Sequence, residues 1–308
     1  MIETADFLAR HGYGGAVRTA LAGDASARRY ERLRGGPEPA ILMHCPPQIS
    51  VEPFLHVATW LHRWRLSAPQ VRAADAESGH VLLEDLGDDL FSRVLAQGGD
   101  ERALYAAAVD LLVFLQGCPP PEGLPAYDDA WLLREAALLT EWYAPNAPAD
   151  DYRAIWQDLL PHVRGGGDGF VYVDYHADNL LWLPGREGHP KIGLLDFQDA
   201  RLGPPAYDLV SLLEDARRDV PPDLADAMTV RYLAARPELD RQAFRAAYAV
   251  LGAQRNAKIL GLFSRLARRD GKPAYLALLP RVAGHLKSDL EHPLLAPLRA
   301  WCDLHLQL

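Results

Sequence analysis

Two short stretches of this chain carry oxygen-bearing side chains that could transfer a phosphoryl group. Asp174 and Asn179 lie five residues apart in the first, and Asp196 follows the apolar run 192–195 in the second. Phosphoryl transfer needs one carboxylate that orients the acceptor hydroxyl and takes its proton. It also needs a neutral oxygen ligand and a second carboxylate that hold magnesium against the phosphates of the nucleotide. These three residues could supply that set.

The spacing of the three residues matches the order found in protein kinases. There the base and the first metal ligand form D-x-x-x-x-N, and the second ligand follows a hairpin as D-F-G. Here two apolar runs, 180–183 and 192–195, flank a turn at 185–188 and predict such a hairpin. This order predicts Asp174 as the catalytic base, and Asn179 and Asp196 as Mg²⁺ ligands beside ATP. The alternative makes Asn179 a turn residue and Asp196 a strand-end cap.

The elements that must position these residues change character along the chain. The first 86 residues predict a small sheet with a packed helix, because short apolar runs alternate with turn residues. We expect helices at 3–11 and 51–66, and strands at 28–33, 40–44, 70–74 and 80–84. From Asp88 on, helical periodicity dominates. The candidate helices cover 101–117, 129–143, 150–163, 204–217, 222–235, 241–268 and 272–288.

Composition excludes several classes of protein. Apolar residues make up 49% and charged residues 24%, as in ordinary globular domains. A net charge of −9 without a broad basic face argues against a nucleic-acid partner. Three scattered cysteines do not form a disulfide framework or a zinc site. Without a secretory signal or a run of about 18 apolar residues, we expect a cytoplasmic protein that does not bind membranes. The oligomeric state stays open.

The stretches that hold the three residues resemble a known family. Residues 173–181 (VDYHADNLL) resemble the catalytic loop of the aminoglycoside phosphotransferase and choline kinase superfamily. Residues 195–213 (LDFQDARLGPPAYDLVSLL) resemble one branch of it, the kinases that phosphorylate the anomeric hydroxyl of N-acetylmuramate and N-acetylglucosamine. Residues 23–30 (GDASARRY) and 254–266 (QRNAKILGLFSRL) are similar to the same branch. The resemblance therefore spans most of the chain in one consistent order.

The resemblance implies a bilobal, protein-kinase-like α+β fold with ATP between the lobes. We expect a nucleotide-binding N-terminal sheet lobe at 1–86 and a larger, mostly helical catalytic and substrate-binding lobe at 87–308. The hinge would lie at 83–87, where the backbone of Glu84 and Leu86 would hydrogen-bond adenine. The side chains of Glu84 and Asp85 are then expected to form a solvated strand end.

The phosphate-binding residues follow from the same resemblance, with one departure. The segment 23–29 contains small residues, among them Gly23 and Ser26. Such residues would let backbone N–H groups approach phosphate oxygens. Many kinases add a lysine from the third strand, but no lysine precedes Lys191 here. We hypothesise that Arg28 or Arg29 meets the phosphate charge instead, since guanidinium suits phosphate geometry.

The catalytic loop departs from the family pattern at its start. Tyr172-Val173 stands where the superfamily usually has His-Gly or His-Arg, and Tyr172 could pack in place of that histidine. Asp208 resembles the family aspartate that braces the loop. The alternative is that Asp208 is only an acidic residue in the first turn of a helix, where its charge interacts favourably with the helix dipole.

Candidate acceptor-binding residues come from the loop and from the helix at 241–268. His176 and Asp178 either structure the loop or contact the acceptor. Arg255 and Lys258 are three apart and share a helix face, where they could approach an acidic substrate such as the lactyl carboxylate of N-acetylmuramate. A solvated basic face is the alternative. Aromatic residues on the helix at 129–143 could line an acceptor pocket or pack in the core: Trp131, Trp142 and Tyr143.

Three functions are compatible with these residues. The first is transfer of the γ-phosphate of ATP, with Mg²⁺, to a small hydroxylated molecule, and the anomeric oxygen of an amino sugar is the first candidate. The second keeps the enzyme class but takes an aminoglycoside or a choline-like acceptor. The third is a nucleotide-binding pseudokinase, which the missing lysine suggests.

Overall fold

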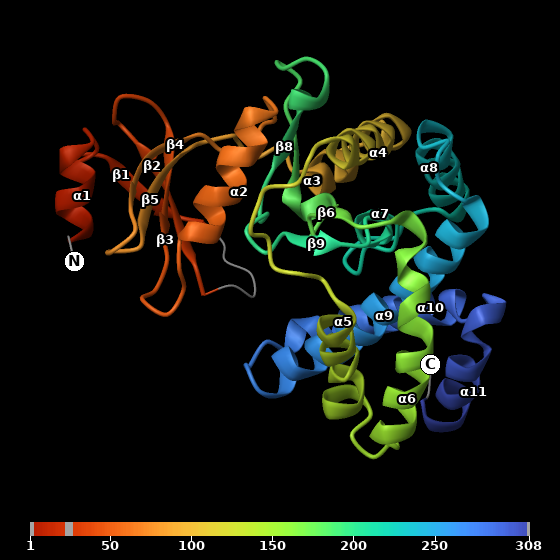
Figure 1. Cartoon of the computed structure of the whole chain (residues 1–308). Coiled ribbons are helices and arrows are strands. Elements are labelled where there is room, and N and C mark those ends of the chain that lie inside the picture. Colours follow the sequence, from red (N-terminus) through yellow and green to blue (C-terminus); the bar gives the residue numbers. More distant parts are fainter. Residues whose placement is uncertain (1–2, 22–26, 307–308) are drawn as a thin grey trace. The chain divides into compact units, whose positions relative to one another are not determined.

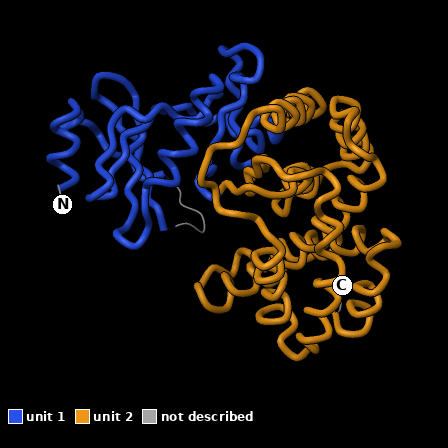
Figure 2. Tube along the Cα trace, in the orientation of Figure 1, with its two compact units in different colours: residues 1–97, 178–199 blue, residues 98–177, 200–308 orange. Residues whose placement is uncertain are grey.

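In the computed structural model, residues 3–21 and 27–306 are described. The chain divides into two compact units (Figure 2). Unit 1 comprises Met1–Gln97 and Asp178–Asp199, and unit 2 comprises Gly98–Ala177 and Ala200–Leu308. The hairpin that carries Asp196 therefore belongs to the unit that contains the N-terminal sheet. The expected lobe boundary after residue 86 stays a prediction.

Unit 1 is built on a five-stranded antiparallel sheet in the order β1-β2-β3-β5-β4 (Figure 1). Its strands are β1 (Val17–Ala20), β2 (Arg29–Arg34), β3 (Ala40–His44), β4 (Val71–Asp75) and β5 (His80–Glu84). Four of the five strands were predicted within one residue at each end. The sequence did not reveal β1, because all four of its residues are exposed and carry no apolar alternation.

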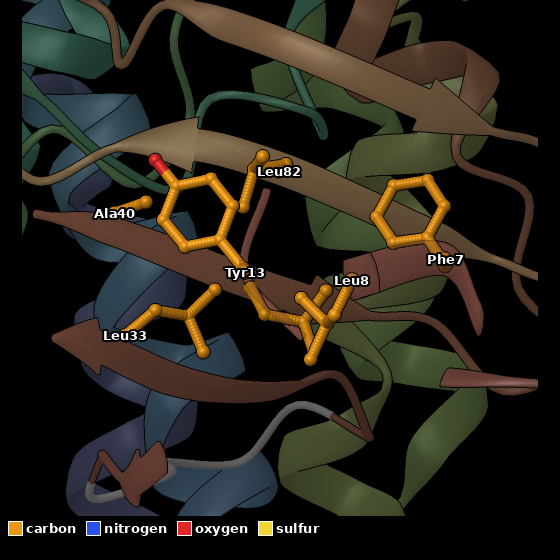
Figure 3. Packing of buried hydrophobic residues seen from close by; sticks show 7 residues of the cluster. Phe7, Leu8, Tyr13, Leu33, Ala40 and Leu82 are labelled. Carbon is orange, nitrogen blue, oxygen red and sulfur yellow. The ribbon is translucent and has the colours of Figure 1, made fainter. Parts of the chain in front are cut away.

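Helices cover this sheet. The predicted helices are present as α1 (Thr4–Arg10) and α2 (Glu52–Arg63), and Figure 1 shows them on opposite sides of the sheet. Residues from α1 and the loop after it pack on alternate strand residues in one buried cluster (Figure 3): Phe7, Leu8, Tyr13, Leu33, Ala40, Leu42 and Leu82. The first four residues of β5 are all buried, as expected for a central strand covered on both faces.

The predicted hairpin is confirmed as β7 (Leu180–Trp182) paired with β8 (Ile192–Leu194). It is attached to the rest of unit 1 through backbone contacts. The N–H of Leu194 donates to the carbonyl of Ser67 at 2.9 Å, and Leu181 forms a bridge with Leu90. Leu90 precedes α3 (Phe91–Ala96), a short helix that was not predicted from the sequence.

Unit 2 is mostly helical, as expected. Its elements are α4 (Glu101–Gly117), α5 (Asp129–Ala136), the π-turn η1 (Leu139–Tyr143), α6 (Ala149–Leu159), η2 (Leu160–Gly166), β6 (Gly169–Val171), β9 (Arg201–Gly203), α7 (Ala206–Leu213), α8 (Pro222–Ala235), α9 (Arg241–Arg268), η5 (Pro273–Leu278), α10 (Leu279–Asp289), η6 (Pro293–Leu295) and α11 (Ala296–His305). The bounds of α4, α8 and α9 match the predicted ones, whereas 129–143 is divided between α5 and η1. The short strands β6 and β9 and the last helix were not predicted.

Helix α9 forms the centre of unit 2, where it packs against η2, α10, η1 and α7. It is buried on most sides, so small residues are needed where neighbours come close. A Cβ at Gly261 would lie 2.2 Å from the carbonyl oxygen of Leu138, and one at Gly252 would lie 2.5 Å from Oδ1 of Asp289. No helix in the described ranges is both long and apolar enough to cross a bilayer.

Candidate active site

The loop that contains Asp174 follows directly on β6 in unit 2. Strand β6 pairs antiparallel with β9, and Val171 lies opposite Arg201. Tyr172 is buried, and its ring packs edge-on against that of Tyr175 with the centroids 5.3 Å apart. The hydroxyl of Tyr175 donates to the carbonyl of Ala108 in α4 at 2.8 Å. The two tyrosines therefore anchor the loop in the core of unit 2 on either side of Asp174.

Asp208 holds the backbone immediately before Asp174. Its buried carboxylate accepts hydrogen bonds from the N–H of Tyr172 at 2.6 Å and from that of Val173 at 2.9 Å. Val173 has a φ of 77°, which is rare for a β-branched residue and costs about 1–3 kcal/mol. Burial raises the pKa of Asp208 to about 7, although the two backbone donors oppose this shift. Asp208 therefore stabilises a strained conformation from which the side chain of Asp174 projects.

A second buried carboxylate meets the other end of the loop. Asp215, just after α7, accepts a hydrogen bond of 3.4 Å from the N–H of Ala177 and one of 2.8 Å from the N–H of Arg217. Asp215 was not predicted from the sequence, because nothing in the local pattern distinguishes it from other acidic residues near helix ends. Within the loop, Tyr175, His176 and Ala177 are buried and Asp174 is half-buried.

The two predicted metal ligands lie next to each other in unit 1. Leu180 pairs with Leu194 in the hairpin, and the N–H of Leu195 donates to the carbonyl of Asn179 at 3.0 Å. This register places Asn179 beside the end of β8, where Asp196 follows with a φ of 61°. Asp178, Asn179 and Asp196 are each half-buried, so the hairpin brings three polar side chains to one accessible end.

Gln198 orients one of these ligands. This nearly buried residue stands where protein kinases have the glycine of D-F-G. Its amide Nε2 donates to Oδ1 of Asp196 at 2.7 Å and to Oδ2 of Asp199 at 3.2 Å. The sequence motif contains Gln198 but does not predict a role for it. Its hydrogen bond restricts the rotation of the Asp196 carboxylate.

The donor set suits a hard cation that binds phosphate. Among the described residues no three His, Cys, Asp or Glu side chains form a cluster that could hold a metal ion. Mg²⁺ usually takes only one or two carboxylates from the protein and completes its shell with water and phosphate oxygens. One carboxylate and one amide oxygen at Asp196 and Asn179 therefore fit Mg²⁺ bound to a nucleotide.

The structure distinguishes the two arginines proposed for phosphate binding. Arg28 is half-buried. Burial raises the pKa of Cys45 and that of Tyr30, and the positive charge of Arg28 partly offsets both shifts. Asp196 further raises the pKa of Tyr30, so Arg28 and Asp196 both act on the same phenol. Arg29 is exposed at the start of β2. Gly23 and Ser26 lie outside the described residues.

The predicted hinge segment is fixed by ion pairs within unit 1. Glu84 pairs with Arg186 at 2.5 Å, and Asp85 pairs with Arg32 at 2.8 Å. The expectation of a solvated strand end is therefore wrong, since these carboxylates bind guanidinium groups brought from β2 and from the hairpin loop. Among the described residues, the backbone N–H and carbonyl of Leu86 form no hydrogen bond.

Arg255 and Lys258 are not on a solvated face, so that alternative is wrong. Arg255 is only 4% exposed and donates to Oγ of Ser211 at 3.0 Å and to the carbonyl of Glu214 at 3.1 Å. It therefore ties α9 to α7. Lys258 forms a 2.7 Å ion pair with Glu135 of α5.

The pair between Lys258 and Glu135 belongs to a network that extends toward Asp174. The hydroxyl of Tyr127 donates to Glu135 at 2.8 Å, and Nζ of Lys258 lies 3.4 Å from the hydroxyl of Tyr207. Burial lowers the pKa of Lys258, but Glu135, Tyr207 and Asp174 outweigh burial and raise it. Asp174 is thus one of three groups whose charge stabilises the ammonium of Lys258.

The aromatic residues suggested for an acceptor pocket lie on two elements. Trp131 is half-buried near the start of α5, and Trp142 and Tyr143 are half-buried in η1. The guanidinium carbon of Arg201 lies 3.4 Å from the centroid of Trp131. Arg269 lies over Trp142 at 5.9 Å.

Comparison with known proteins identifies the family of this chain. The family model described as "Phosphotransferase enzyme family" (APH) matches residues 17–244. An N-acetylmuramate/N-acetylglucosamine kinase from Caulobacter vibrioides is 41% identical, and the match covers 97% of this chain and 94% of the relative. A protein of the same name from Pseudomonas putida is 34% identical over 87% of this chain and 82% of its own length.

Solved structures share the fold at much lower identity. A choline kinase from Streptococcus pneumoniae superimposes with a TM-score of 0.63 at 12% identity, covering 87% of this chain and 94% of its own. A putative aminoglycoside phosphotransferase from Ralstonia eutropha gives a TM-score of 0.66 at 14% identity, covering 93% and 96%. The expected α+β kinase-like fold is therefore confirmed.

Proposed function

Since this chain belongs to the phosphotransferase enzyme family, we propose that it transfers the γ-phosphate of ATP to the anomeric hydroxyl of N-acetylmuramate or N-acetylglucosamine. The observation that carries the choice of acceptor is the 41% identity, over nearly the full length, with a curated kinase of these two sugars. Structural neighbours that act on choline or aminoglycosides are below 20% identical and support the fold alone.

In the proposed reaction, Asp174 orients the sugar hydroxyl and accepts its proton. A base is useful only if its carboxylate stays ionised and does not move. The charge of Asp174 helps to raise the pKa of Lys258, and Asp208 fixes the strained backbone at Val173. The buried tyrosines on either side keep the loop in place, so Asp174 is positioned before the acceptor binds.

Asn179 and Asp196 would hold Mg²⁺, which would supply positive charge against the phosphates of the nucleotide. The hairpin register keeps these two residues adjacent, and Gln198 fixes the orientation of the Asp196 carboxylate. The backbone of Leu86 would bind the adenine edge. Arg28 is the better of the two arginine candidates for the phosphates, because its charge acts on the same tyrosine as that of Asp196.

The proposed function is tested by measuring ADP production with a panel of acceptors. We expect turnover with N-acetylmuramate and N-acetylglucosamine, and a phosphorylated product that has lost its reducing end because the anomeric oxygen is blocked. Choline and aminoglycosides should give less than about 1% of this rate, because one unmatched buried contact already costs about 1–3 kcal/mol. Tight ATP binding without turnover of any acceptor would instead indicate a pseudokinase.

Gln198→Leu is expected to raise the Mg²⁺ concentration for half-maximal turnover about tenfold. Leucine keeps the volume but removes the amide that orients Asp196, and the loss of such supporting hydrogen bonds typically weakens metal binding 10–100-fold. The measurement is an Mg²⁺ titration of ADP production, together with calorimetric binding of Mg²⁺–ADP. Gln242→Leu, at an exposed position in α9, is the control. An unchanged Mg²⁺ requirement would show that this hydrogen bond does not serve the metal.

A further inference from the structure

The guanidinium groups of two arginines lie over the indole ring of Trp131. The guanidinium carbon of Arg201 lies 3.4 Å from the ring centroid, and that of Arg134 lies 4.6 Å from it. Arg201 also lies 5.9 Å from the ring of Tyr127. We call Trp131, Arg134 and Arg201 the arginine clamp. Two like charges on one indole repel each other, so their convergence needs a compensating interaction.

The arginine clamp has no carboxylate of its own. Across the described ranges 3–21 and 27–306, neither Arg134 nor Arg201 forms an ion pair, whereas other arginines of unit 2, such as Arg164, Arg218 and Arg231, do. Arg201 donates one hydrogen bond, to the carbonyl of Ala126 at 3.3 Å. A guanidinium has five donors, so most of those on Arg201 remain available to an anion. In a chain with a net charge of −9, two unpaired guanidinium groups on one ring are unexpected.

The arginine clamp in unit 2 is positioned by elements next to the catalytic loop in sequence or in strand pairing. Arg201 of β9 lies opposite Val171 of β6. Val171 is three residues before Asp174 in the sequence. The N–H of Tyr127 donates to the carbonyl of Leu202 at 2.7 Å, which ties the chain before α5 to the same strand. Asp128 then caps α5 by accepting from the N–H of Trp131 at 2.8 Å.

The face of α5 that carries Trp131 also carries Glu135, the partner of Lys258. Trp131 and Glu135 are four residues apart and therefore lie on one side of the helix. Glu135 binds Lys258, whose charge interacts with Asp174. A molecule that presents a hydroxyl to Asp174 could therefore reach the arginine clamp with its other end.

We propose that the arginine clamp binds the carboxylate of an acidic acceptor and so distinguishes N-acetylmuramate from neutral N-acetylglucosamine. This inference rests on the proposed function. The two sugars differ by a lactyl ether that carries one negative charge, and guanidinium binds carboxylate in a bidentate geometry that ammonium cannot match. Stacking on Trp131 holds Arg201 in place before the sugar arrives, which reduces the entropy lost on binding. Arg255 does not serve this purpose, because Ser211 and Glu214 already bind it in the core.

The test compares both sugars with the variant Arg201→Gln. Loss of a charge-assisted contact should raise KM for N-acetylmuramate about 10–100-fold, while kcat for that sugar and both constants for N-acetylglucosamine stay within about twofold. Arg201→Lys should recover part of the affinity for N-acetylmuramate. Arg134→Gln should have the same selectivity but a smaller effect, because Arg134 is exposed.

Arg269→Gln is the matched control, since Arg269 also lies beside a tryptophan but is paired with Asp270. It should leave both sugars unaffected. An equal loss for both sugars in Arg201→Gln would assign Arg201 a structural role, and no change at all would place the carboxylate elsewhere; either result overturns the inference and leaves the kinase assignment intact. A wild-type protein that phosphorylates neither sugar would overturn the proposed function, and this inference with it.

Discussion

Asp174→Asn is expected to lower kcat about 10³-fold while leaving the affinity for ATP within about twofold. Asparagine keeps the shape of the side chain but cannot accept the proton of the sugar hydroxyl, and general-base catalysis typically contributes 10²–10⁴-fold. The nucleotide should bind as before, because the residues proposed to contact it lie elsewhere in the sequence. The measurements are steady-state ADP production and calorimetric binding of a non-hydrolysable ATP analogue.

The control for this variant is Asp150→Asn, an exposed carboxylate in the first turn of α6. It removes the same charge from the protein without touching the loop, and it should retain full activity. Turnover by Asp174→Asn at more than about a tenth of the wild-type rate would contradict the assignment of Asp174 as the base. Lost ATP binding would instead show that the loop had changed its conformation.

Lys258→Met is expected to lower the free energy of unfolding by about 3–5 kcal/mol. Lys258 and Glu135 form an ion pair with both side chains only 15% exposed, and removing one partner leaves the other charge buried and unpaired. This is a large part of the stability of an ordinary protein, which is about 5–15 kcal/mol. The measurement is urea denaturation followed by tryptophan fluorescence.

A second substitution separates the buried charge from lost packing. Glu135→Gln in the Lys258→Met background removes the unpaired charge and keeps an oxygen that can accept from Tyr127, so most of the stability should return. Arg231→Met breaks an exposed pair with Asp110, whose side chains are 46% and 41% exposed, and should cost less than about 1 kcal/mol. If the single variant Lys258→Met and the double variant were equally unstable, the lost packing of the lysine stem would explain the loss of stability.

Asp208 illustrates which features of this site can be predicted from the sequence and which depend on tertiary contacts. Its position after Pro204-Pro205 suggested either a brace or a helix-dipole residue, and the sequence could not choose between them. The choice depends on contacts with Tyr172 and Val173, 36 and 35 residues away. No local pattern encodes the direction of a side chain across such a distance, since it is set by the way β6 packs near α7.

The two residues on α9 show the same limit. Their spacing correctly placed Arg255 and Lys258 on one helix face, because helical periodicity is a local property. Whether that face is solvated depends on what packs against it, and the periodicity of α9 is weak because the helix is buried on most sides. The partners of these two cations, Ser211 and Glu135, are more than 40 residues away in the sequence.

The sequence by itself determined the hairpin of β7 and β8, the family and the bounds of α4, α8 and α9, because spacing, turn residues and periodicity act over a few residues. Tertiary structure decided which cations are buried, which carboxylates hold the loop, and that Arg201 stacks on Trp131 from 70 positions away. Such long-range contacts depend on the packing of whole elements against one another. Many residues along the chain have the charge needed to pair with a given cation or carboxylate, and only the fold determines which of them come into contact.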